Sequence, residues 1–177
     1  MESDQELIEL ANKGDSDAFE ALYHRYRDWV YRLAWRFTGN RTDALDALQE
    51  TFTYLLGKFP GFELTASMTT FLYPVVRHVS FTIRNKRSRF TAEEELLNEL
   101  SAPKSGEIGH YRSELAAVLI VLPEEQREVL LMRFVDDMSL QEIVAALDIP
   151  LGTVKSRLHN ALKLLRGDRR TRSYFLE

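Results

Sequence analysis

MSLQEIVAALDIPLGTVKSRLHNALKLLR, residues 138–166, carries the clearest structural signal in the chain. It begins with Ser139-Leu140-Gln141-Glu142, which has the S-x-x-E form of a capping box, in which two side chains bond free backbone N–H groups at a helix start. Apolar residues recur at helical spacing on both sides of Asp148-Ile149-Pro150. Proline interrupts a helix because it lacks an N–H donor. We therefore predict two short amphipathic helices joined by a tight turn, which is a helix-turn-helix.

The second of these helices, expected to start after Gly152, has two chemically different faces. At about 100° per residue its apolar side chains point in one direction. The opposite side and its flanks carry short hydrogen-bonding side chains and cations: Thr153, Lys155, Ser156, Arg157, His159, Asn160 and Lys163. A helix in the DNA major groove requires this layout, for base edges and phosphates respectively. An ordinary solvated helical hairpin would carry mixed charge, whereas residues 151–172 contain seven Lys or Arg and one acid. The pattern favours DNA binding.

The composition argues against several other classes of protein. Cysteine is absent, which removes disulfide frameworks and thiolate metal sites. The eight glycines are scattered, and the four histidines lack the spacing of metal ligands, so we expect no cofactor, no metal and no enzymatic activity. The acidic start, MESDQELIEL, is unlike a secretory signal, and the longest apolar run, residues 115–122, is too short to span a bilayer. These features predict a soluble, cytoplasmic protein with no membrane insertion.

Charge is distributed unevenly along the chain, whose formal net charge is −4. Residues 77–90 contain five Lys or Arg and no acid, and residues 151–172 form a second basic segment, whereas residues 1–57, 91–114 and 115–150 are each net acidic. Two basic segments on an acidic chain predict two separate DNA contacts. The remaining surface is then kept off DNA or binds a protein partner.

Helical patterns also fill the N-terminal half. Apolar residues follow helical spacing through residues 4–57 and again through residues 67–87. The pattern breaks at Lys13-Gly14-Asp15, at Gly39-Asn40 and at Phe59-Pro60-Gly61-Phe62. No segment alternates as a strand would, so we predict an all-α protein.

Capping signals mark the starts of three of these helices. Ser16 or Asp17 is expected to cap the helix that follows the first break, and Thr42 or Asp43 the helix after the second. Pro123 is predicted as the first residue of a later helix with acids in its first turn.

The helical pattern fails from residue 91 to about residue 109. This segment, TAEEELLNELSAPKSGEIG, combines an acidic cluster with Ser, Ala, Pro and Gly, which is typical of an interdomain linker. We therefore predict two small helical domains joined by a flexible linker. The N-terminal domain is residues 1–90, the linker 91–110, and the C-terminal domain with the helix-turn-helix 111–177.

Three segments of the chain resemble bacterial sigma factors of the extracytoplasmic-function group. LPEEQREVLLMRFVDDMSLQEIVAALDIPLGTVKSRLHNALKLLR, residues 122–166, resembles their promoter-reading C-terminal domain. AFEALYHRYRDWVYRLAWRFTGNRTDALDALQETF, residues 18–52, resembles their polymerase-binding helices, and SMTTFLYPVVRHVSFTIRNKRSR, residues 67–89, their −10 element helix and basic tail. Residues 152–158 alone also resemble response-regulator helix-turn-helices, so the order of the segments carries the resemblance.

The resemblance implies two of the binding surfaces. Six residues of the polar helix face match the positions that read the −35 element, with Asn160 where many members carry arginine: Thr153, Lys155, Ser156, Arg157, His159 and Asn160. Lys163 is added to this contact from the helix face alone. A second set matches the surface that docks on the coiled coil of the largest polymerase subunit: Asp43, Asp46, Gln49, Glu50 and Phe52. Leu45 stands where that motif usually has an acid.

The resemblance also implies a −10 contact, in which a loop and the start of the next helix capture an unstacked base. The loop is residues 62–67. The matching DNA-binding positions are Thr69, Thr70, Phe71, Arg77, His78, Arg84, Lys86 and Arg87. A tryptophan is common at the position of Phe71 and an asparagine at that of His78. Phe59, Phe62 and Phe71 are nevertheless better explained as core residues than as stacking platforms.

The function implied is a sigma factor that binds core RNA polymerase and promoter DNA and is restrained by an anti-sigma factor. Two alternatives stay open: a helix-turn-helix regulator that binds duplex operator DNA without polymerase, and a helical adaptor that binds only protein. Transcription by core polymerase with and without the chain distinguishes the three.

Overall fold

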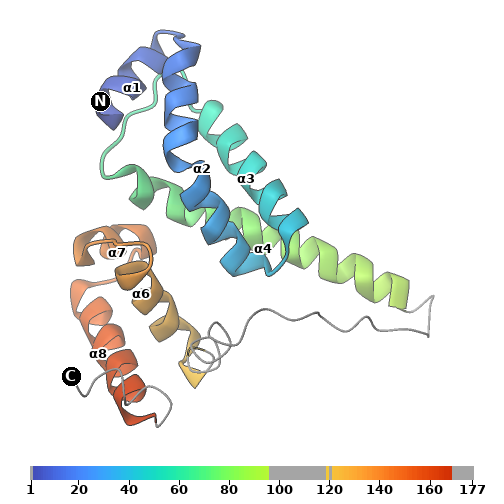
Figure 1. Cartoon of the computed structure of the whole chain (residues 1–177), viewed down its shortest axis with the longest axis vertical. Helices are drawn as coiled ribbons and strands as arrows, with labels where there is room; N and C mark the ends of the chain where they lie inside the picture. The colour runs from blue at the N-terminus through green and yellow to red at the C-terminus, as the bar shows by residue number, and fades with distance from the viewer. Residues whose placement is uncertain (1, 96–118, 120, 169–177) are drawn as a thin grey trace. The chain divides into compact units, whose positions relative to one another are not determined.

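The computed structural model describes residues 2–95, 119 and 121–168, and all regular secondary structure within these residues is helical (Figure 1). The all-α prediction is therefore confirmed. In chain order the helices are α1 (Asp4–Asn12), α2 (Ser16–Thr38), α3 (Arg41–Leu56), α4 (Met68–Glu95), α6 (Glu124–Phe134), α7 (Leu140–Leu147) and α8 (Leu151–Gly167). None of the helices in these ranges combines the length and apolarity that crossing a membrane requires.

The chain divides into two compact units, Met1–Leu100 and Ser101–Glu177. Helix α4 continues to Glu95, past the expected domain end at residue 90. The rest of the predicted linker, the predicted return of order at residue 111 and the end of the second basic segment, residues 169–172, lie outside the described residues. The residue limits of the two domains therefore stay a prediction.

In the N-terminal unit, α2, α3 and α4 pack against one another, and α1 packs against α2. Figure 1 shows α2 and α3 as an antiparallel pair that lies across α4. Every one of these helices contributes large, fully buried side chains, among them Leu7, Ile8, Leu22, Leu33, Leu55, Met68, Leu72 and Tyr73. One apolar face per helix is therefore removed from water, and this burial holds the unit together.

The predicted caps of α2 are wrong. Asp15 caps this helix, since its Oδ1 accepts hydrogen bonds from the N–H groups of Asp17 (2.9 Å) and Ala18 (3.2 Å). A capping residue needs an extended backbone, which Asp15 has, with φ −74° and ψ 109°, whereas Ser16 and Asp17 are already helical.

The cap of α3 is Asn40 and not Thr42 or Asp43, which already lie inside the helix. The Asn40 Oδ1 accepts a hydrogen bond from the Asp43 N–H at 2.9 Å, and its Nδ2 donates to the Asp43 carboxylate at 2.6 Å. Asp43 thus lies in the first turn, where a negative charge is stabilised by the free N–H groups of the helix start.

The C-terminal unit contains the predicted helix-turn-helix, α7 and α8. Its capping box is present, because the Ser139 Oγ accepts from the Glu142 N–H (3.2 Å) and the Glu142 carboxylate from the Ser139 N–H (2.8 Å). Asp148 ends α7 in the left-handed conformation, with φ 52°. Helix α8 was expected to start after Gly152. It begins instead at Leu151, so Gly152 lies inside its first turn.

Helix α6 packs against α8, and α7 contacts both. Leu122, Leu130, Ala161 and Leu165 form one buried cluster of this unit. Pro123 is the N-cap of α6, one position earlier in the helix than predicted, and acids fill the first turn as expected.

Candidate nucleic-acid interface

The predicted base-reading face of α8 lies on the surface. Val154, Ala161 and Leu165 are buried on one side of the helix. Of the predicted DNA-binding residues, those exposed are Lys155, Ser156, His159, Asn160 and Lys163, while Thr153 and Arg157 are half-buried. The Ser156 hydroxyl donates to the Thr153 carbonyl at 3.0 Å, which leaves its lone pairs available as acceptors. Helix α8 contains four cations and no acid, so this face is chemically complementary to DNA.

Arg157 has a partner that the sequence did not reveal. Its Nη2 lies 2.5 Å from the Glu125 carboxylate on α6, and the Arg157 side chain is 22% exposed while that of Glu125 is 69% exposed. The pair joins α8 to the first turn of α6. An exposed ion pair contributes about 1 kcal/mol or less, so a phosphate can compete with Glu125 for this guanidinium.

The predicted cations of α4 are arranged partly by aromatic rings. The guanidinium groups of Arg77 and Arg84 lie 5.2 and 4.7 Å from the centre of the Phe81 ring. The Arg84 Nη1 also donates to the Phe37 carbonyl on α2 at 3.4 Å. His78 and Lys86 are exposed on the same helix. A guanidinium has five N–H groups, so Arg84 can bond a phosphate in addition to the Phe37 carbonyl.

Arg87 is tied to the start of α3. Its Nη1 lies 3.2 Å from the Asp43 carboxylate, whose side chain is only 9% exposed. Asp43, one of the predicted polymerase-binding residues, is buried between Arg87 and Asn40. The two residues are 44 positions apart, and no local pattern in the sequence indicates their pairing.

The start of α4 is held by hydroxyl groups. The Ser67 Oγ lies 2.9 Å from the Thr69 Oγ1 and 2.8 Å from the Thr70 Oγ1, and Thr70 is buried. Phe71 is half-buried, with its ring 4.8 Å from that of Phe62. Its aromatic surface is therefore used mainly in packing.

The predicted polymerase-binding residues separate into two groups. Asp46, Gln49 and Glu50 are exposed on α3, whereas Phe52 is buried, with its ring 4.8 Å from that of Tyr23. Phe52 is therefore a core residue, because α2 covers the face of α3 on which it lies.

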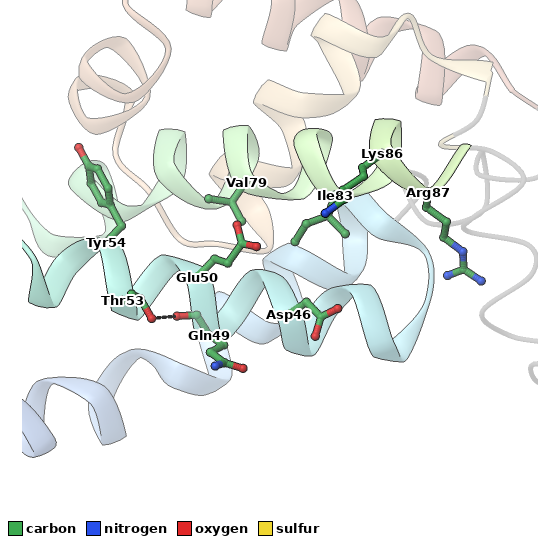
Figure 2. Close-up of a pocket in the computed structure, with 9 residues that line it drawn as sticks. All are labelled: Asp46, Gln49, Glu50, Thr53, Tyr54, Val79, Ile83, Lys86 and Arg87. Atoms are coloured by element: carbon green, nitrogen blue, oxygen red, sulfur yellow. Dashed lines mark hydrogen bonds between the residues drawn. The ribbon is translucent and has the colours of Figure 1, made fainter. Parts of the chain in front are cut away.

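The three exposed residues border a groove of about 930 Å³ between α3 and α4. Val79, Ile83 and Lys86 line it from α4 (Figure 2). Figure 2 shows the Glu50 side chain directed toward α4 and that of Gln49 directed away from it. No cluster of potential metal ligands occurs within the residues that the structure describes.

Two models of known protein families match this chain. Residues 22–90 match sigma-70 region 2, and residues 112–165 match sigma-70 region 4. The chain is 28% identical over 173 residues to the ECF RNA polymerase sigma factor SigW of Bacillus subtilis, covering 90% of this chain and 92% of SigW. It is 34% identical over 162 residues to the ECF RNA polymerase sigma factor SigE of Mycolicibacterium smegmatis, covering 84% of this chain and 60% of SigE.

A solved structure shares the fold. It is the sigma factor RpoE in complex with the anti-sigma factor NepR from Bartonella quintana, with a TM-score of 0.63, 20% identity, and coverage of 84% of this chain and 94% of RpoE. The two region matches, their order and the SigW and SigE similarities lead to one assignment. The chain belongs to the extracytoplasmic-function group of bacterial RNA polymerase sigma factors.

Proposed function

We propose that this sigma factor, which directs promoter recognition and transcription initiation, binds the −35 element, the −10 element and core polymerase through three separate surfaces. The −35 element is bound by the exposed face of α8. The observation that carries this assignment is the position of Lys155, Ser156, His159, Asn160 and Lys163 opposite the buried side of the helix, with no acid among them. Short polar side chains then meet base edges, and the lysines meet phosphates.

The −10 element is assigned to the loop of residues 62–67 and to α4. Extruding a base from the duplex costs a few kcal/mol, which the loop contacts must offset. Supporting this assignment, the guanidinium groups of Arg77 and Arg84 both lie against the Phe81 ring of α4, which gives the strand two neighbouring cations to follow. Tethering the −10 and −35 contacts raises the effective concentration of the second once the first has formed.

We assign Asp46, Gln49 and Glu50 to the contact with core polymerase. These side chains are exposed along one helix, and the family motif places polymerase contacts at the same positions. Asp43 and Phe52 are left out of this surface, because both are buried.

Three further assignments follow from the family. An anti-sigma factor is a partner, as NepR is for RpoE. The protein acts in the cytoplasm, where bacterial polymerase and DNA are found. It contributes binding energy and no catalytic residue, since opening a promoter requires contacts distributed over polymerase and DNA.

Run-off transcription tests the proposal. Purified core polymerase is incubated with a library of genomic fragments, with and without the chain, and the start sites are mapped. New start sites that share −35 and −10 sequences support the proposal. A gel shift of duplex DNA by the chain alone, without stimulated transcription, would favour the operator-binding regulator. Neither activity would favour the protein-binding adaptor.

A further inference from the structure

The last residue of α1, Asn12, holds the loop that follows α3. The Asn12 Oδ1 accepts hydrogen bonds from the N–H groups of Gly61 (2.7 Å) and Phe62 (3.0 Å), and the Nδ2 donates to the Phe62 carbonyl (2.9 Å). One side-chain amide therefore satisfies both backbone polar groups of Phe62, as a paired strand would. Leaving such groups unpaired away from water is costly, so the contact defines the loop conformation.

Asn12 lies on an element that is itself fixed in place. Leu7 and Ile8 of α1 are buried against the rest of the unit. The Asp4 carboxylate accepts from the Arg25 Nη1 at 2.5 Å and from the Tyr26 hydroxyl, both on α2. Burial, followed by the hydrogen bond to Asp4, raises the pKa of Tyr26, so its hydroxyl remains a donor. The position of Asn12 is thus set by α2.

The loop is fixed at two residues, Phe62 and Ser67, here called its anchors, and a short exposed segment lies between them. At the first, the Phe62 ring is 7% exposed and lies 5.4 Å from Phe59 and 4.8 Å from Phe71. At the second, Ser67 contacts the hydroxyls of the first turn of α4. Residues 63–66 connect the anchors, and all of them except half-buried Leu64 are exposed. This connecting segment is the part of the −10 loop that is accessible to a DNA base.

We propose that Asn12 is a positioning residue for −10 recognition: by pairing with Phe62 it keeps residues 63–66 in the conformation that accepts the extruded base. A loop that is already ordered loses less conformational entropy when it binds, so its affinity for the base is higher. Helix α1 lies outside the region 2 match, residues 22–90, and outside every DNA surface assigned above. The inference rests on the proposed −10 role of this loop.

The test uses reconstituted holoenzyme and three variants. Asn12→Ala removes all three hydrogen bonds. Asn12→Asp keeps the side-chain volume but replaces the donor to the Phe62 carbonyl with a second oxygen. Asp15→Ala is the matched control, because it removes the α2 cap a few residues away and the side-chain hydrogen bonds of Asp15 do not reach the loop.

Each holoenzyme is titrated with a fluorescein-labelled non-template strand that covers the −10 element mapped by run-off transcription. Affinity for core polymerase is measured in parallel, and hydrogen exchange is followed in the free chain. We expect Asn12→Ala to bind the strand about tenfold more weakly, with unchanged polymerase affinity and faster exchange at Gly61 and Phe62. Asn12→Asp should also bind the strand more weakly, because its second oxygen faces the Phe62 carbonyl, but it keeps the acceptor of both N–H groups and should change their exchange less. Asp15→Ala should bind the strand as the wild type does.

The proposal would be overturned if the Asn12 variants bound the strand as tightly as Asp15→Ala does. The hydrogen bonds between Asn12 and the loop would then have a structural role only. Equal loss of strand and polymerase binding would also overturn it, since the defect would be global. Failure of the wild-type holoenzyme to start transcription would instead refute the proposed function, which keeps the two failures distinguishable.

Discussion

Replacing Lys155 by alanine tests how α8 meets DNA. This lysine is exposed on a flank of the polar face of α8. Each phosphate contact contributes about −0.9 to the slope of log affinity against log salt concentration. Losing one contact should therefore reduce the slope by about 0.9. A rise from about 50 to about 200 mM salt then weakens the wild type about 3.5-fold more than the variant.

The assay is fluorescence anisotropy of holoenzyme on a labelled promoter fragment, at several potassium chloride concentrations and with several −35 sequences. The loss should be similar on all sequences, because a phosphate contact carries no base information. Lys13→Ala is the control, since Lys13 is an exposed lysine in the other unit and outside the proposed surfaces. A salt slope identical to that of the wild type would refute the phosphate contact, and a loss confined to one −35 sequence would show that Lys155 reads a base.

Four other predictions address the remaining assigned residues. Asn160→Ala should change preference at one −35 base and cost about 1–3 kcal/mol there; equal loss on every sequence, in the same anisotropy assay, would contradict base reading. Charge reversal at Asp46 and Glu50 should abolish polymerase binding in a pull-down while leaving the thermal unfolding midpoint nearly unchanged, because both are exposed; retained binding would disprove the assignment. Glu125→Gln should strengthen promoter binding a few-fold, since it frees Arg157 and removes a negative charge that repels DNA; weaker binding would mean that the Arg157–Glu125 pair positions α8. Phe52→Ala should lower the free energy of unfolding by about 3–5 kcal/mol in a urea titration, and a loss below about 1 kcal/mol would mean that its site is not core.

The helices and the exposed polar face of α8 were predictable because their signals are local. Ser139 and Glu142 are three positions apart, and the apolar stripe of α8 repeats along one helix. The polar face follows from the same periodicity. A signal confined to one or two helical turns does not depend on the rest of the fold.

The errors have physical causes that lie outside any short window. Helix caps depend on where the backbone leaves the extended conformation, and Asn40 and Thr42 differ in this although both are polar. The burial of Asp43 beside Arg87 and of Phe52 beneath α2 could not be predicted, because both depend on tertiary contacts. Asn12 gave no signal, since its partners lie about fifty positions away.

The Asp43–Arg87 pair has a consequence for genetics. It joins the first turn of α3 to a basic stretch of α4 through a mostly buried carboxylate. Substitutions at Asp43 should therefore disturb how α4, which carries the proposed −10 cations, is held against α3. A genetic screen for altered start-site choice should recover substitutions of Asp43. Second-site substitutions that compensate for them should map to Arg87, its ion-pair partner.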